Sequence, residues 1–455
     1  MKNYSTFYLV HRQTKSLIFL ILFIMGIQVN AQERWSLKEC ITYAIKNNLQ
    51  LHQADLSEQI ASQSYQKSKW NLLPGIGAGA DAGKNYGRSV DPNTNGIINT
   101  SFFNNSYYIG ASVDVFRGFM LQNQIRYQKF RKESTENYRE NATDDLAFEV
   151  MNAFFNVVYQ EEMQKIANEQ KAISELNVKK MEILVSTGLK AQTELLEVKA
   201  NFEKDELLCI QSANNIVSAW IRLKKAMNLP PDQQITLAVV DENLITADEI
   251  TLDIAGLFKK HSQRSPYIRM VENDWKASQK DVKIQKAGFL PYLSLQAGYN
   301  TGFYETNKDA GQRTISFSNQ IKNNQSQYVV ASLSIPIFSK KAVWFNVSQS
   351  KLLSEQAETK LNQSRQNLLY EMKQNYNDLT AAWKELQQSR NQLEADKLSF
   401  QAAQKKFDQG MINAIEFYMV KNRLASTTSQ VLHSKLTLEI KKRTLDFYKG
   451  TRFWE

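Results

Sequence analysis

Apolar and polar positions along this chain follow two different periods, and the period changes at defined places. Between residues 32 and 71 the apolar side chains recur every three to four residues, which predicts helices. Ser36 and Glu39 predict a capping box at the start of the first helix, and a second helix is expected from about Gln50 to Trp70. At Leu72 the period changes to two, which predicts a β-strand.

Two alternating segments enclose a polar loop at about residues 84–106 and predict a β-hairpin over about residues 72–116. In the second segment Ile109 and Val113 fall on one face, whereas Gly110 and Ser112 fall on the other. One face is therefore apolar and the other small or polar, as the lipid side and the lumen side of an outer-membrane strand are. The alternate glycines of residues 75–79 predict the crowded face of a curved strand.

A proline-free stretch from Phe116 to Leu229 predicts unusually long helices. Gly118 and Gly188 are its only glycines, and helix-forming residues dominate its composition. One helix of about seventy residues would be about 100 Å long. That length exceeds what a globular core needs and is typical of coiled coils and related arrays. We expect the chain to turn at Gly188 and a second long helix to return toward residues 227–231.

The second half of the chain repeats this plan. The segment "GLKAQTELLEVK" at residues 188–199 shares its glycine, a glutamate, a valine and its lysine with "GMINAIEFYMVK" at residues 410–421, an offset of 222. "LLPG" at residues 72–75 and "FLPY" at residues 289–292 are related by a shorter offset of 217. We therefore expect a first repeat at residues 32–230, an inter-repeat equatorial segment at 231–263, and a second repeat at 264–455.

The second repeat is predicted to contain a helix, a hairpin over about residues 290–338 and long helices that turn at Gly410. The two strands of this hairpin are expected at residues 291–300 and 328–338. The fold class is therefore mainly α-helical with membrane β-strands, two strands and two long helices in each repeat.

The first 31 residues have the features of a cleaved secretory signal peptide. Lys2, Arg12 and Lys15 precede an apolar run at residues 17–27, and a small-residue motif at residues 29–31 predicts cleavage after Ala31. The run is too short to span a bilayer, and no later stretch reaches the eighteen consecutive apolar residues typical of a membrane helix. We expect an exported protein without transmembrane helices.

The composition gives no support for catalysis, a metal site or a cofactor. The four histidines are scattered, and no nucleophile, base or metal-ligand spacing is present. Cys40 and Cys209 lie in predicted helices; an oxidising compartment permits pairing, but two small buried residues are the simpler interpretation. The net charge is +10, but the lysines and arginines are interspersed with many acidic residues. This pattern favours a solvated helical surface over nucleic-acid binding.

The number of strands predicts an assembly of several copies. Four strands cannot close a barrel, because closed membrane barrels contain at least about eight strands. An open sheet edge in lipid would leave backbone groups unsatisfied at several kcal/mol each. Cyclic symmetry solves this problem, and three copies would give twelve strands around a lumen. The polar helices would then extend from the barrel on the periplasmic side as a tube.

The order and repetition of these motifs resemble the outer-membrane factor family typified by TolC. The resemblance rests on the "SLKECITYAIKNN" opening, on "LLPG" and "FLPY" before the strands, and on the two glycine-centred helix turns. It covers nearly all of the predicted mature chain. It implies a homotrimer with a twelve-stranded β-barrel and a periplasmic α-helical barrel. It also implies two kinds of partner, a periplasmic adaptor (membrane fusion) protein and an inner-membrane pump of the RND or ABC type.

The resemblance assigns a periplasmic gate and an adaptor-docking tip to the two turns. Glu416, six residues after Gly410, matches an acidic residue that narrows the lumen in the family, and Glu194 matches it in the first repeat. Three such carboxylates around one axis would attract cations. For each glutamate alone, an exposed helix residue is the simpler interpretation. The docking tip would comprise five residues: Gly188, Leu189, Gly410, Met411 and Ile412.

Two positions depart from TolC. A second acidic residue is replaced here by Met419, and an arginine is replaced by Ile412. A single acidic ring or a largely apolar gate is therefore as compatible with the sequence as a double ring. The predicted function is the outer-membrane exit duct of a tripartite efflux or type I secretion system. The alternative is an exported coiled-coil structural protein or adhesin whose alternating segments are ordinary soluble hairpins.

Overall fold

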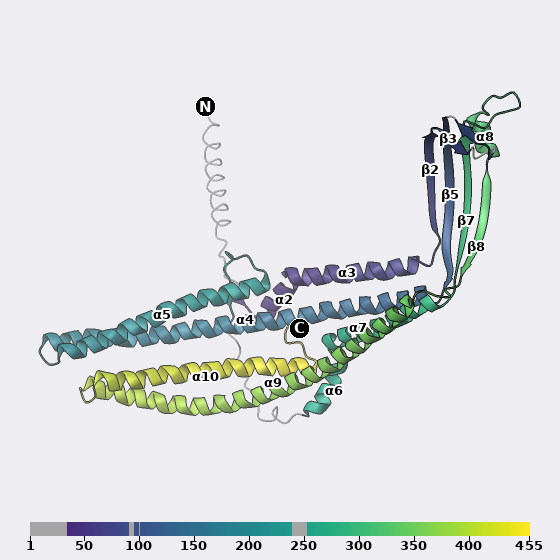
Figure 1. The fold of residues 1–455 in the computed structure, drawn as a ribbon. Coiled ribbons are helices and arrows are strands. Elements are labelled where there is room, and N and C mark those ends of the chain that lie inside the picture. Colours follow the sequence, from purple (N-terminus) through teal and green to yellow (C-terminus); the bar gives the residue numbers. More distant parts are fainter. Residues whose placement is uncertain (1–33, 91–94, 100, 239–252) are drawn as a thin grey trace, which may run out of the picture. The chain divides into compact units, whose positions relative to one another are not determined.

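The computed structural model describes residues 34–90, 95–99, 101–238 and 253–455 (Figure 1). The predicted signal peptide, residues 1–31, and residues 239–252 of the inter-repeat segment lie outside the described residues. The chain forms two compact units, each assembled from distant parts of the sequence. Residues 34–48, 145–238 and 375–455 belong to the first, here called the helical unit, and residues 49–144 and 253–374 to the second, the sheet unit.

The sheet unit contains a four-stranded antiparallel sheet in the order β2-β5-β7-β8. Its strands are β2 (Gly75–Asn85), β5 (Phe102–Arg117), β7 (Tyr292–Tyr304) and β8 (Ser326–Ser334). Figure 1 shows the four strands side by side as one elongated sheet. Because strand order follows chain order, the two predicted hairpins lie next to each other, with β5 paired to β7. Within the described residues the outer edges of β2 and β8 have no further partner strand.

The register separates an apolar face from a small and polar face. One row across the sheet aligns Ile76, Ala111, Ala297 and Val329, all apolar. The next row aligns Gly77, Gly110, Gly298 and Tyr328. Both Ile76 and Val329 are 74% exposed, so nothing in the described part of the chain covers the apolar face at these two positions. A patch of this kind indicates contact with lipid or another protein.

Tyrosine rings cover two glycines on the small and polar face. A Cβ atom on Gly79 would lie 2.4 Å from the ring of Tyr108, and one on Gly298 would lie 2.5 Å from the ring of Tyr328. A larger residue at either position would displace the ring that the neighbouring strand places over the backbone. The prediction of a crowded glycine face is confirmed for Gly79, whereas Gly75 and Gly77 face open space.

Helices complete the sheet unit at one end of the strands (Figure 1). They are α3 (Leu49–Trp70), α6 (Ile254–Arg264), α7 (Pro266–Lys286), the 3-10 turn η2 (Ala287–Phe289), and the first parts of α4 (Met120–Ser186) and α9 (Ala342–Asp408). Polar contacts join them: Arg131 and Ser134 of α4 contact Asp274 of α7 at 2.6 and 2.8 Å. Ser265 caps α7, and Pro266 occupies its first position, where the missing N–H is not needed.

The loops at the opposite end of the strands contain elements that the sequence did not predict. A short ladder pairs β3 (Arg88–Val90) with β4 (Ile97–Asn99), and α8 (Phe317–Asn323) lies between β7 and β8. Gln320 of α8 is 1% exposed, accepts a hydrogen bond from the Tyr304 amide and donates one to the Tyr304 carbonyl. One side chain thus satisfies the last backbone groups of β7.

The helical unit contains α2 (Leu37–Asn47), α5 (Gln192–Met227), α10 (Ala414–Lys449) and the remaining parts of α4 and α9. Ser36 and Glu39 form the predicted capping box of α2. A short parallel ladder joins β1 (Arg34–Trp35) to β6 (Thr236–Leu237). Cys40 and Cys209 are both buried and unpaired, as expected. None of the helices in the described residues is both long and apolar enough to cross a membrane.

The duplication is visible in the bounds of the elements. α4 and α9 each have 67 residues, α5 and α10 each have 36, and each pair is related by the offset of 222. α2 and α6 each have 11 residues and are related by the offset of 217, as are the starts of β2 and β7. α6 therefore corresponds to the first helix of the first repeat, although it falls in residues that the sequence analysis placed in the inter-repeat segment.

Several strand boundaries differ from the predictions. β5 begins at Phe102, within the predicted polar loop. β7 continues to Tyr304 rather than ending near Asn300. β8 ends at Ser334, although the alternation of apolar residues predicted a strand to Phe338. Pro336 has no N–H to donate to a ladder, and the chain then enters two consecutive residues with positive φ, Lys340 and Lys341.

Candidate functional site

The two predicted turns have the same backbone structure. Gly188 and Gly410 adopt positive φ values of 77° and 73°. The Leu189 amide donates to the Leu184 carbonyl and the Met411 amide to the Lys406 carbonyl, each at 2.8 Å. This six-to-one hydrogen bond closes a helix after a left-handed residue, a conformation that glycine adopts without a Cβ penalty. Both glycines are therefore placed by the geometry of the turn.

Leu189 and Met411 project from the turns. Their side chains are 71% and 70% exposed. Ile412, the third predicted apolar contact, is half-buried and packs against the cluster beneath the turns, so it contributes less to the surface. Two of the three apolar residues assigned to the docking tip are thus available to a partner.

The two matched glutamates occupy the same place in their helices but have different surroundings. Each is the third residue of its helix, α5 for Glu194 and α10 for Glu416. Glu194 forms an ion pair with Lys190 at 2.9 Å and is partly buried. Glu416 is exposed; its amide donates to the Asn413 side chain at 2.8 Å, and its carboxylate accepts from Asn413 at 3.3 Å. Within the described residues Glu416 forms no ion pair with a lysine or arginine.

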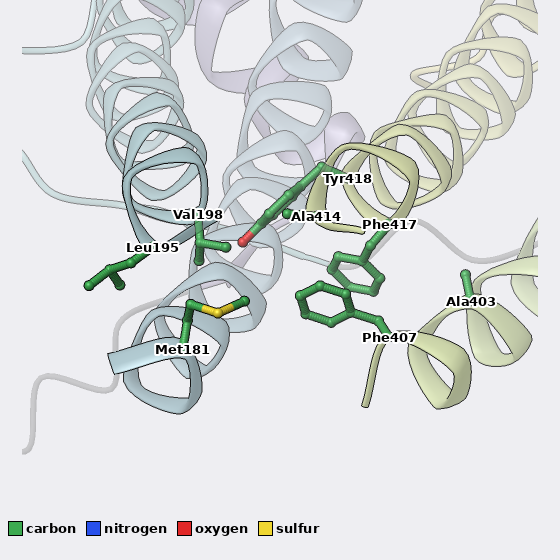
Figure 2. Close-up of a cluster of buried hydrophobic side chains, with 8 residues drawn as sticks. All are labelled: Met181, Leu195, Val198, Ala403, Phe407, Ala414, Phe417 and Tyr418. Carbon is green, nitrogen blue, oxygen red and sulfur yellow. The ribbon is translucent and has the colours of Figure 1, made fainter. Parts of the chain in front are cut away.

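An apolar cluster lies directly behind the turns and joins the two helical hairpins (Figure 2). Phe407 and Phe417 stack with ring centroids 4.7 Å apart. The cluster takes its remaining members from both hairpins: Met181, Leu195, Val198, Ala403, Ala414 and Tyr418. In Figure 2 the Tyr418 ring extends from its helix toward Val198 of the other hairpin. The four helix ends that carry the turns therefore share one core.

A buried polar cluster follows this core and was not predicted from the sequence. Lys421 of α10 forms an ion pair with Asp205 of α5, and their side chains are 1% and 6% exposed. The Lys421 ammonium also donates to Ser174 of α4 at 2.7 Å, and Ser174 donates to Asp205. Burial lowers the pKa of Lys421, and the contact with Asp205 opposes that shift.

The second repeat contains a related polar pair at the equivalent positions. The offset of 222 relates Ser174 to Asp396 and Asp205 to Thr427, and Thr427 donates to Asp396 at 2.7 Å. The hydroxyl and the carboxylate have exchanged helices. Arg423, half exposed, pairs with Asp396 within the same hairpin. Lys421 differs because it connects α10 to the other hairpin.

A sequence signal for Lys421 and Asp205 did exist. Lys421 lies three and four residues after the buried Tyr418 and Phe417, on the apolar stripe of α10. Asp205 lies on the stripe of α5 that includes Val198 and Cys209. A charged residue on the buried stripe of a helix is destabilising unless an opposite charge pairs with it. Two such residues of opposite charge therefore indicate a buried ion pair. No group of three His, Cys, Asp or Glu side chains in the described residues is arranged to hold a metal ion.

Comparison with known proteins identifies the architecture. The sequence profile of the family named "Outer membrane efflux protein" matches residues 40–229 and 257–451. The outer membrane protein TolC of Vibrio cholerae serotype O1 is 20% identical over 405 residues, which cover 88% of this chain and 87% of that protein.

Solved structures show the same fold at low sequence identity. The CmeC outer membrane channel of Campylobacter jejuni is 15% identical, with a TM-score of 0.78 over 89% of this chain and 84% of CmeC. CusC is 17% identical, with a TM-score of 0.77 over 92% of each chain. The predicted fold class is confirmed by these similarities. The chain therefore belongs to the outer membrane efflux protein family and is an outer-membrane channel protein whose polar helices extend into the periplasm.

Proposed function

We propose that three copies of this chain form the outer-membrane exit duct of a tripartite efflux or type I secretion system. The observation that carries the proposal is a sheet with two unpaired edges and an uncovered apolar face. A lone sheet of this kind cannot exist in lipid, because its edge amides and carbonyls would have no partners. The sheet therefore requires other copies to close it.

The direction of the strands allows closure by identical copies. Each neighbouring pair in the sheet is antiparallel, so β2 and β8 run in opposite directions. Placing β8 of one copy beside β2 of the next therefore continues the antiparallel ladder. The contact joins two different edges, so rotation about an axis generates a ring. Three copies give twelve strands, enough to leave a lumen.

The two faces of the sheet suit the lipid and the lumen. The row of Ile76, Ala111, Ala297 and Val329 would contact acyl chains, and outer-membrane lipid is therefore one partner. The rows that contain the alternate glycines, Gln296 and Tyr328 would line an aqueous passage. The long polar helices would continue the passage through the periplasm.

Glu416 is the better gate candidate of the two matched glutamates. It is exposed and forms no ion pair with any residue that the structure describes, whereas Glu194 is paired with Lys190. Three copies of Glu416 near the axis would concentrate negative potential at the closed end of the tube. The exposed Leu189 and Met411 would form the surface that a periplasmic adaptor protein grips, and the adaptor would connect the duct to an inner-membrane pump of the RND or ABC type.

The alternative of a soluble coiled-coil filament or adhesin has no specific support. Soluble hairpins bury one face against a core, whereas Ile76 and Val329 of this sheet face outward uncovered. Family membership likewise favours the channel.

The mass of the complex extracted from the outer membrane tests the assembly. After subtraction of bound detergent we expect about three chains per particle. A monomer or an open-ended filament would contradict the proposed duct.

Conductance in a planar bilayer tests the gate. Replacing Glu416→Gln should reduce the preference for cations, because the variant removes an unpaired charge and retains the shape of the side chain. Glu194→Gln is the matched control and should change selectivity little, since that carboxylate is already paired. Equal selectivity of the wild type and Glu416→Gln would remove Glu416 from the gate.

A further inference from the structure

An apolar groove lies where the last strand of the sheet gives way to the helix α9. It has a volume of about 690 Å³. Its lining is dominated by apolar residues and one lysine: Phe289, Pro336, Ile337, Phe338, Trp344, Phe345 and Lys341. The groove lies entirely within the sheet unit. In the orientation proposed above, β8 crosses the membrane and α9 is too polar to do so, and the groove would lie at the periplasmic surface of the bilayer.

Several apolar side chains of this groove are largely exposed. Ile337 is 96% exposed, Phe338 78% and Phe345 60%. Trp344 and Phe345 form an edge-to-face pair with centroids 5.0 Å apart, so the two rings present one continuous apolar surface. Aromatic side chains at this level of a membrane protein contact the boundary between headgroups and acyl chains.

Lys341 lines the groove, and Lys340 directly precedes it in the chain. Lys340 and Lys341 are exposed, and among the described residues no carboxylate lies within ion-pair distance of either. The sequence contains no acidic residue between Asp309 and Glu355. The groove therefore combines an apolar floor with two positive charges that the chain itself does not neutralise.

The first repeat lacks this combination at the equivalent junction. The offset of 222 relates Lys340 to Gly118 and Lys341 to Phe119, and all four residues have positive φ. Glycine adopts that conformation freely, whereas a lysine is strained in it. The lysines are therefore not explained by the backbone geometry. The nearest basic residue of the first junction, Arg117, is already paired with Asp114 at 3.1 Å.

Charge also distinguishes between a lipid and a second copy as the occupant. In the proposed ring, the segment of the next copy nearest to this groove precedes its β2 strand. That segment carries Lys67 and Lys69, and no acidic residue occurs between Glu58 and Asp81. Its charge would repel Lys340 and Lys341. An anionic headgroup complements all four lysines, and basic sites at membrane surfaces bind such headgroups.

We propose that the groove is a binding site for an anionic phospholipid of the periplasmic leaflet. The lipid phosphate contacts Lys340 and Lys341, and an acyl chain lies across Ile337, Phe338 and Trp344. The site rests on the membrane orientation proposed above, not on the number of copies. Bound lipid would anchor the start of α9 to the membrane surface.

Native mass spectrometry of the full-length complex in detergent tests this site. Phosphatidylglycerol and phosphatidylethanolamine are added at equal concentration, and we expect the wild type to retain the anionic lipid about tenfold more. The double variant Lys340→Gln/Lys341→Gln should lose this preference. Arg117→Gln is the matched control and should keep it, because Arg117 is already paired. The same spectra report the number of chains, so failure of the trimer and failure of the lipid site are distinguishable.

Fluorescence of the wild type provides a second measurement that does not depend on the lysine variants folding. Phosphatidylglycerol with brominated acyl chains should quench tryptophan emission, and Trp344→Phe should remove part of the quenching. Equal retention of the two lipids would overturn the proposal, as would an unchanged preference in the double variant. Absence of quenching at Trp344 would show that no acyl chain lies against this residue, and would overturn the proposal as well.

Discussion

Lys421 shows how one residue can connect two parts of a duplicated protein. Its ammonium and the Asp205 carboxylate are removed from water and bind each other and Ser174, and the centroid of the Tyr418 ring lies 5.0 Å from the ammonium. Removing one member of a buried pair leaves an uncompensated charge. Because Lys421 belongs to one hairpin and Asp205 to the other, this pair fixes the register of the two hairpins behind the turns.

We expect Lys421→Ala to destabilise the helical unit by about 3–5 kcal/mol. The duplication supplies the control: Lys199, the equivalent lysine, forms an exposed pair with Glu182, and Lys199→Ala should cost less than about 1 kcal/mol. Thermal unfolding in detergent, followed by circular dichroism, measures both. Restoration of the melting temperature in the double variant Lys421→Met/Asp205→Leu would confirm that the loss comes from the unpaired charge. Equal effects of Lys421→Ala and Lys199→Ala would contradict this role.

The sequence predicted the matched lysines but not their different environments. Lys199 and Lys421 occupy the same position of the repeated motif, yet one is exposed and the other is buried. Which face of a helix is covered depends on the packing of the hairpins, and the partner Asp205 is 216 positions away. The position of Lys421 on the apolar stripe indicated that it needs a buried partner, but only the structure identified that partner as Asp205.

At the level of elements, the turns at Gly188 and Gly410 depend on a backbone conformation rather than on contacts. A Cβ atom at Gly410 would meet nothing within 4 Å. An alanine at this position is therefore unfavourable only because the backbone there has a positive φ. We expect Gly410→Ala to destabilise the turn by about 1 kcal/mol and Gly410→Asn to cost less, because asparagine tolerates this conformation. Hydrogen exchange of the amides of residues 406–415 measures the difference. Equal protection in both variants would show that the turn does not need a left-handed residue.

The exposed apolar residues of the turns make a separate prediction about partners. Met411→Asp should weaken binding of the periplasmic adaptor protein by roughly tenfold or more, since exposed apolar anchors dominate such contacts. Leu176→Asp is the matched control, because Leu176 is 66% exposed on α4 but lies before the apolar core that supports the turn. Surface plasmon resonance with the purified adaptor compares the two variants. A similar loss in both would indicate a nonspecific effect of charge.

Periodicity predicted the elements better than it predicted their ends. The long helices and their glycine turns followed from the absence of proline and from helical spacing. The alternation through Ile335 and Ile337 predicted strand, but these residues lie beyond β8 and Ile337 lines the groove instead. Alternating apolar residues look the same in the sequence whether they lie within a strand or just beyond its end. α8 was missed because its residues are polar and its order depends on Gln320.

For the whole molecule, the decisive feature is that its sheet is incomplete in one chain. The family was predicted from repeated motifs and is confirmed, whereas closure by three copies remains a proposal. The number of copies could be inferred from the sequence only by counting strands. Each strand was visible as an alternating segment, but the pairing of β5 with β7 and the free edges of β2 and β8 required the structure.

Disulfide cross-linking tests whether β8 of one copy lies beside β2 of the next. Cys40 and Cys209 are first replaced by alanine, and Ala331→Cys in β8 is then combined in turn with Ile76→Cys, Ala78→Cys or Ala80→Cys in β2. All four positions lie on the apolar face. We expect at least one combination to give covalent dimers and trimers on denaturing gels.

Links within one chain are excluded by distance. β5 and β7 separate the two edges, and three strand spacings amount to about 14 Å, whereas a disulfide joins Cβ atoms about 4 Å apart. Gly77→Cys with Ala331→Cys is the matched control, because its two thiols lie on opposite faces and should not react. If no combination cross-links while the protein still folds in the membrane, the edges do not meet, and closure by repetition of this sheet is wrong.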